Sequence, residues 1–184
     1  MTRKDIPNLI SILRMALAVP VVVALLTQRF ELALTLFLIA GISDGLDGFL
    51  AKQYGWSSRL GGLLDPLADK LLLVTALLAL GWLGAVPLWL VAIVILRDVV
   101  IVTGATIYNY RITKLDAKPT LLSKINTVVQ IALVLAVMLN HGIVSLPVWF
   151  FQGLIWATLV TTVSSGAHYV WVWSRHAAQL TSQH

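Results

Sequence analysis

Four aspartates between residues 44 and 69 are the side chains best suited to chemistry in this sequence. They are Asp44, Asp47, Asp65 and Asp69, half of the eight acidic residues of the chain. Asp44 and Asp47 are three residues apart, and Asp65 and Asp69 are four apart, so each pair would lie on one face of an α-helix. Two such helices facing each other would bring four carboxylates together, which like-charge repulsion opposes unless cations lie among them.

This spacing predicts a site for divalent cations. Carboxylate oxygens suit Mg²⁺, Mn²⁺ or Ca²⁺, and the absence of cysteine excludes thiolate sites for zinc or iron–sulfur clusters. Two such ions about 4 Å apart can neutralise a pyrophosphate and stabilise a leaving phosphate. A nearby carboxylate can take the proton from an attacking hydroxyl. From the residues alone, we expect a metal-dependent transferase that acts on a phosphate-bearing substrate.

A purely structural interpretation is available for one of these residues. Asp65 directly precedes Pro66, so it could be an N-cap ahead of a proline at the first helical position. The same interpretation does not account for four aspartates with glycines beside them. Gly41, Gly45 and Gly48 fall next to Asp44 on the expected helix, where glycine allows another backbone or a ligand to approach closely.

The composition indicates where this site must operate. Hydrophobic residues make up 59% of the 184 residues and charged residues only 11%, whereas roughly a quarter of an ordinary soluble domain is charged. We therefore expect an all-α integral membrane protein with a single domain over residues 1–184. The net charge of +5 is interpreted as a sign of orientation in the membrane, not of nucleic-acid binding.

Six apolar runs are each of roughly the length that crosses a bilayer. The first carries Arg14, which argues against a cleaved signal peptide, and Asn8, Ser11 and Arg14 are spaced to line one polar face of it. A proton or ion transporter with intramembrane aspartates is the alternative from another class. It is disfavoured because the sequence shows no internal repeat. The runs cover residues 9–27, 32–47, 65–82, 88–108, 121–139 and 148–173.

The loops between these runs predict the orientation. Of the 13 basic residues, only Arg29 falls on the second side of a six-span arrangement. By the positive-inside rule, both termini and the aspartates then face the cytoplasm, at an inner (plasma) membrane.

The aspartate stretch resembles the signature of the CDP-alcohol phosphatidyltransferases. The matching pattern is Asp44-x-x-Asp47-Gly48-x-x-Ala51-Lys52, eight residues, then Gly61-x-x-x-Asp65-x-x-x-Asp69. The family usually has arginine where this chain has Lys52. A lysine keeps the charge and loses the bidentate fork for a phosphate.

The resemblance implies a role for each residue of the pattern. Asp44, Asp47, Asp65 and Asp69 would bind two divalent cations, Mg²⁺ or Mn²⁺, and Asp69 would also be the catalytic base. Asp44, Gly48, Lys52 and Gly61 would contact the CDP group. An alcohol would attack the β-phosphorus of CDP-diacylglycerol and expel CMP. Such enzymes are typically homodimers in the membrane, surrounded by lipid.

The acceptor alcohol is a separate question. The segment Lys118 to Gln130 is similar to that of cardiolipin synthases of the eukaryotic, CMP-forming type, as are Arg97-Asp98 and Ile6-Pro7-Asn8-Leu9. Phosphatidylglycerophosphate synthases commonly have a second lysine where this chain has Asn126, which suits the dianion of glycerol 3-phosphate. We therefore expect phosphatidylglycerol as acceptor, with glycerol 3-phosphate as the alternative. The candidate acceptor-binding residues are Asn8, Arg14, Arg97, Lys118, Lys124 and Asn126.

Overall fold

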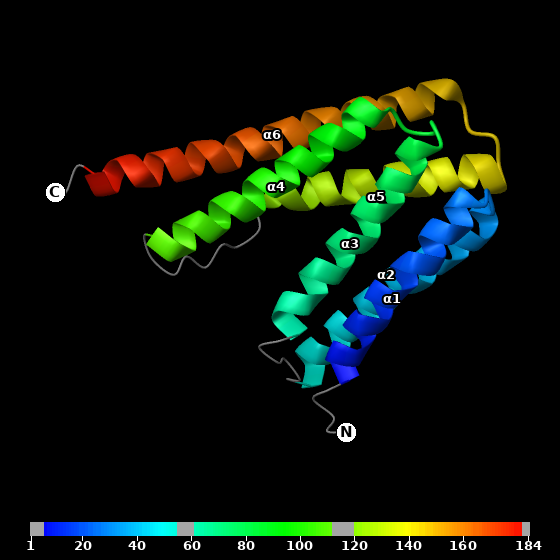
Figure 1. Ribbon diagram of the computed structural model, residues 1–184, viewed down its shortest axis with the longest axis horizontal. Coiled ribbons are helices and arrows are strands. Elements are labelled where there is room, and N and C mark those ends of the chain that lie inside the picture. Colours follow the sequence, from blue (N-terminus) through cyan, green and yellow to red (C-terminus); the bar gives the residue numbers. More distant parts are fainter. Residues whose placement is uncertain (1–5, 55–60, 112–119, 182–184) are drawn as a thin grey trace. The chain divides into compact units, whose positions relative to one another are not determined.

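The computed structural model describes residues 6–54, 61–111 and 120–181, with side chains described over 11–45, 67–104 and 120–172. All regular structure in these ranges is α-helical, as expected (Figure 1). The helices are α1 (Ile6–Leu26), α2 (Phe30–Tyr54), α3 (Gly61–Trp82), α4 (Leu88–Arg111), α5 (Leu121–Gly142) and α6 (Val148–Thr181).

The helices overlap the six predicted apolar runs, and several extend further. α2 continues to Tyr54 and α3 begins at Gly61, so all four aspartates lie inside helices and not at their ends. α6 continues to Thr181. Among the described residues, Leu121–Gly142 and Val148–Val172 are long and apolar enough to cross a membrane, and Ser11–Leu26 is a shorter apolar helix.

The chain divides into two compact units. The first contains α1, α2, α3 and the end of α5 from Val134. In it α1 packs against both α2 and α3, and α1 and α2 run side by side (Figure 1). Buried alanines on the three helices allow this close approach. They are Ala18, Ala24, Ala33, Ala40, Ala68, Ala76 and Ala79.

Local hydrogen bonds define the turn that follows α1. Gln28 adopts a positive φ of 58°, its N–H donates to the Leu25 carbonyl and the Arg29 N–H donates to the Ala24 carbonyl. This is the Schellman pattern, which satisfies the free carbonyls of a helix end. The predicted runs 9–27 and 32–47 are thus separated by a turn, but α2 already starts at Phe30, two residues before the predicted run.

The end of α5 meets this turn at a glycine. A Cβ added at Gly142 would lie 3.1 Å from the backbone nitrogen of Glu31 and 3.3 Å from the Cβ of Phe30. The ring of His141, one residue earlier, stacks on Phe30 with centroids 4.9 Å apart. Gly142 therefore allows α5 to approach the start of α2.

Gly142→Ala should lower the free energy of unfolding by about 1–2 kcal/mol, because the new methyl group overpacks this contact. The matched control is Gly153→Ala in α6, where an added Cβ meets nothing within 4 Å. That change should be neutral or stabilising by up to about 1 kcal/mol, since alanine favours helix. Thermal unfolding in detergent measures both, and equal midpoints for the two variants would contradict the packing described.

The second unit contains α4, α6 and α5 up to Leu133. α4 packs against α6. Polar side chains connect α5 to these two helices.

Candidate functional site

The four aspartates lie on two helices that share α1 as a neighbour. Asp44 and Asp47 belong to α2, and Asp65 and Asp69 to α3. The i,i+3 and i,i+4 spacings therefore place each pair on one helix face, as predicted. The side chains of Asp44 and Asp69 are described and are 39% and 46% exposed. Those of Asp47 and Asp65, and of Gly48, Lys52 and Gly61, lie outside the described side chains.

A buried arginine from α1 joins the two helices. Nη1 of Arg14 lies 2.6 Å from Oδ1 of Asp44 and 2.5 Å from Oδ1 of Asp69. Arg14 is only 1% exposed, and Ser11, one turn earlier on the same face, is also buried. The predicted polar face of the first helix is thus turned toward the aspartates, although the side chain of Asn8 lies outside the described ones. One nitrogen atom brings carboxylate oxygens of α2 and α3 together.

This convergence is what a cation site requires of its ligands. Two carboxylate oxygens meet at one positively charged atom, and both side chains remain open to solvent. Among the described side chains no group of three or more acidic or histidine residues could hold a metal ion, since two of the four aspartates fall outside that set. The oxygen donors that are described suit Mg²⁺ or Mn²⁺.

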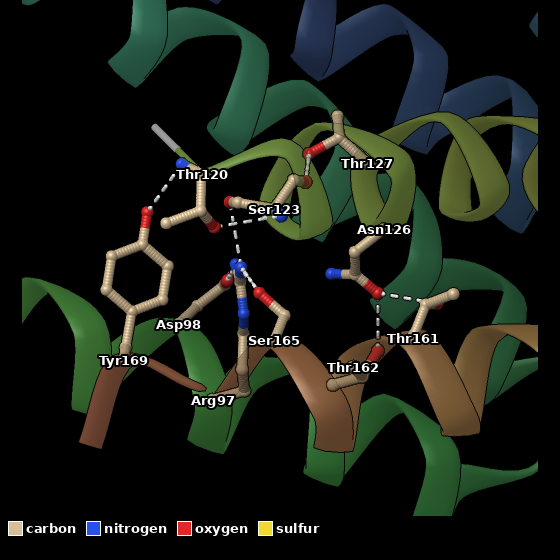
Figure 2. A network of polar contacts seen from close by, with 10 residues as sticks. All are labelled: Arg97, Asp98, Thr120, Ser123, Asn126, Thr127, Thr161, Thr162, Ser165 and Tyr169. Carbon is tan, nitrogen blue, oxygen red and sulfur yellow. Dashed lines mark hydrogen bonds and ion pairs between the residues drawn. The ribbon is translucent and has the colours of Figure 1, made fainter. Parts of the chain in front are cut away.

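A second polar group lies in the other unit, around Arg97 of α4 (Figure 2). Nη1 of Arg97 donates to Oδ1 of Asp98 at 2.9 Å, and Nη2 donates to the hydroxyls of Ser123 at 2.8 Å and Ser165 at 2.5 Å. Gly166 lies beside the stem of Arg97, where an added Cβ would be 3.4 Å from the arginine Cγ. A buried guanidinium therefore ties α4 to α5 and α6.

Asn126 occupies the next turn of α5. Its Oδ1 accepts hydrogen bonds from the hydroxyls of Thr161 at 3.0 Å and Thr162 at 2.8 Å (Figure 2). Asn126 is buried, whereas Lys124 on the same helix is exposed. Lys118 lies outside the described residues. Of the predicted acceptor-binding residues, Arg97 and Asn126 thus lie in this second polar group. Arg14 lies with Asp44 and Asp69.

Sequence reasoning missed several members of this second group. Ser123 and Ser165, which bind Arg97, and Thr161 and Thr162, which bind Asn126, were not among the predicted site residues. In α6, polar residues recur at positions 158, 161, 162 and 165, a helical spacing that marks one face. That periodicity was the available signal.

Comparisons with known proteins agree with the aspartate motif. A model of the CDP-alcohol phosphatidyltransferase family matches residues 4–164. A probable CMP-forming cardiolipin synthase of Drosophila melanogaster is 34% identical over 90% of this chain and 56% of its own length. The human CMP-forming cardiolipin synthase is 30% identical over 95% of this chain and 63% of its own length.

A relative named for another activity has a comparable sequence identity. The CDP-diacylglycerol–glycerol-3-phosphate 3-phosphatidyltransferase of Cereibacter sphaeroides is 32% identical over 88% of this chain and 76% of its own length. The chain spans less than two thirds of the two cardiolipin synthases above and more of the bacterial enzyme.

Proposed function

Because the chain belongs to the CDP-alcohol phosphatidyltransferase family, we propose that it transfers a phosphatidyl group from CDP-diacylglycerol to phosphatidylglycerol, giving cardiolipin and CMP. The observation that carries the proposal is the convergence of Asp44 and Asp69 on Arg14. It joins the two halves of the family motif, which are on separate helices.

Members of this family generally depend on divalent metal ions. We propose that Asp44, Asp47, Asp65 and Asp69 hold two of them, Mg²⁺ or Mn²⁺. The fit rests on the described half of this set, whose oxygens converge at one cationic atom and stay accessible to solvent. When bound, such ions neutralise the pyrophosphate and stabilise the leaving phosphate.

The residues of the chain then perform the remaining steps. Gly48, Lys52 and Gly61, with Asp44, hold the CDP group. Asp69 takes the proton from the acceptor hydroxyl, and its partial exposure leaves it accessible for this. The alcohol oxygen bonds to the β-phosphorus, and the bond from that phosphorus to the bridging oxygen breaks. The electron pair leaves with CMP.

The proposed acceptor site uses Asn8, Arg14, Arg97, Lys118, Lys124 and Asn126. Two described features favour the neutral glycerol head of phosphatidylglycerol. Asn126 is uncharged, and the charge of Arg97 is offset by Asp98 at 2.9 Å. Glycerol 3-phosphate is a dianion, and neither Asn126 nor the paired Arg97 offers a free positive charge to balance it. Glycerol 3-phosphate is the second candidate, because the bacterial relative is named for it.

We also propose the membrane arrangement that such a lipid substrate requires. All six helices would span an inner membrane as one domain over residues 1–184, with both termini and the aspartates at the cytoplasmic face, and the protein would be a homodimer. The two helices that are long and apolar enough to span a membrane support this. The sequence supports it too, since only Arg29 of the basic residues falls on the second side of a six-span arrangement.

The acceptor is tested by offering phosphatidylglycerol, glycerol 3-phosphate or inositol in turn. The purified full chain receives labelled CDP-diacylglycerol and Mg²⁺, and the lipid product is identified by mass. We expect cardiolipin from phosphatidylglycerol and little product from the other two alcohols. If a product forms only with glycerol 3-phosphate, the protein is a phosphatidylglycerophosphate synthase and the cardiolipin proposal is wrong.

Arg14→Met tests the charge balance of the aspartates. Without Arg14, the carboxylates of Asp44 and Asp69 repel each other unless cations are present. We therefore expect the thermal midpoint to fall in chelator by about 2–6 °C, because the partners are partly exposed and their interaction is screened. Added Mg²⁺ should raise the midpoint more in the variant than in the wild type. An equal rise in both proteins would contradict this charge balance.

A further inference from the structure

The polar side chains between α5 and α6 follow a regular antiparallel register. The Thr120 N–H donates to the Tyr169 hydroxyl at 3.3 Å, Ser123 and Ser165 share the guanidinium of Arg97, and Thr162 donates to Asn126. Each step moves about one turn forward on α5 and one turn back on α6 (Figure 2). We call this set of facing side chains the polar seam.

Continued by one turn along both helices, the same register pairs Gln130 of α5 with Thr158 of α6. Gln130 is 4% exposed and Thr158 is fully buried. Nε2 of Gln130 and Oγ1 of Thr158 have no hydrogen-bond partner within the part of the chain that is described. Nδ2 of Asn126, one turn before Gln130, also has no hydrogen-bond partner among the described residues. Beyond its hydrogen-bonded levels, the register of the seam leads to buried polar atoms that have no partner among the described residues.

The orientation of the Thr158 hydroxyl is informative. Hydroxyls inside helices commonly bond to the carbonyl four residues earlier, and those of Thr75, Thr127 and Thr161 do so here. The Thr158 hydroxyl makes no such bond. It does not bond to the backbone carbonyl four residues earlier on its own helix.

Buried polar groups in apolar surroundings are unfavourable unless something bonds to them. We propose that Gln130 and Thr158, with the open end of the Asn126 amide, bind a hydroxyl group. A hydroxyl both donates and accepts, so it can bond to either end of an amide and to Thr158. All three side chains are neutral, which excludes a charged ligand at this depth because its charge would have no counterpart. The hydroxyl belongs either to a bound water or to the glycerol head of the acceptor; the second source rests on the proposed function.

The experiment uses Gln130→Met, Thr158→Val and the double variant in the full-length protein. Both substitutions keep approximate shape and remove the polar atoms. The matched control is Thr127→Val, since Thr127 is an exposed residue of α5 that bonds only to its own helix. Thermal midpoints are measured with and without phosphatidylglycerol, and KM is measured separately for both substrates.

If a hydroxyl is bound, each single variant should lower the midpoint by about 2–4 °C, because the ligand loses one partner. The midpoint of the double variant should fall by less than the sum of the two single effects. Each single variant keeps one of the two polar atoms, Gln130 Nε2 or Thr158 Oγ1, beside a weakened ligand site, whereas the double variant has neither. With no ligand, each single variant removes an unpaired buried group and should raise the midpoint, and the two effects should add. Single variants that are as stable as the control or more stable, with unchanged KM values, overturn the proposal.

The two sources of the hydroxyl give different patterns. A bound water predicts lower midpoints without any lipid acceptor and unchanged KM values. An acceptor hydroxyl predicts that the lower midpoint appears only with phosphatidylglycerol. It also predicts that KM for phosphatidylglycerol rises about threefold to tenfold while KM for CDP-diacylglycerol stays constant. If the wild type releases no CMP, the proposed function fails, while the midpoints measured without acceptor still test the water site.

Discussion

Replacing Asp69 by asparagine should reduce the rate of CMP release by about 10²- to 10⁴-fold, the usual contribution of a positioned general base. The amide keeps the shape of the carboxylate and cannot accept the proton of the acceptor hydroxyl. The fold should persist, because the Asp69 side chain is 46% exposed and Arg14 retains Asp44 as a partner. The measurement is the initial rate of CMP release at saturating substrate, together with a thermal midpoint.

Glu31→Gln is the matched control for this variant. Glu31 is an exposed carboxylate at the start of α2, far along that helix from Asp44, and its amide variant should keep wild-type activity. Raising the Mg²⁺ concentration separates the two roles of Asp69, since a variant that had lost only a ligand would recover with excess cation. An Asp69→Asn protein that keeps more than about a tenth of the wild-type rate would exclude the base assignment.

Replacing Arg97 by methionine should produce the largest loss of stability, about 3–5 kcal/mol. The Asp98 side chain is only 13% exposed and would lose its cation, and the hydroxyls of Ser123 and Ser165 would lose their shared donor. Removing the cation beside a largely buried carboxylate costs more than the net value of the pair. Denaturation in detergent, followed by helical signal, measures this loss.

The double variant Arg97→Met, Asp98→Asn shows whether charge is the cause. It removes the negative charge of Asp98 together with the guanidinium, so it should be more stable than Arg97→Met alone. Arg29→Met is the control for loss of an exposed arginine and should change stability by less than about 0.5 kcal/mol. A double variant as unstable as the single one would place the effect in packing and not in charge.

The helix positions of the four aspartates were largely predictable because their signals are local. The three- and four-residue spacings on two helices follow from sequence alone, and the resemblance to this enzyme family is confirmed by the family match over residues 4–164. The polar face with Ser11 and Arg14 was also predicted. Arg14 contacts both Asp44 and Asp69 because α1 lies against both α2 and α3. The periodicity of the sequence does not show how these helices pack.

The polar seam was less predictable because its contacts cross between helices. Arg97 and Asp98 are adjacent in sequence, but the sequence does not show that Arg97 also donates to Ser123 and Ser165. Whether a threonine in α6 bonds to its own helix or to Asn126 depends on the register between helices. Thr161 does both, and Thr162 bonds across. The helix ends also differed from the predicted runs, because α2 continues beyond Asp47 to Tyr54 and α3 begins at Gly61, four residues before Asp65.

The most direct test of metal-dependent phosphatidyl transfer is CMP release by the purified full-length protein. The protein receives CDP-diacylglycerol and phosphatidylglycerol, with either Mg²⁺ or an excess of chelator. We predict one CMP for each cardiolipin formed, loss of both products in chelator, and recovery when Mg²⁺ or Mn²⁺ is added back. Absence of CMP under every condition, or undiminished release in chelator, would contradict the proposed function.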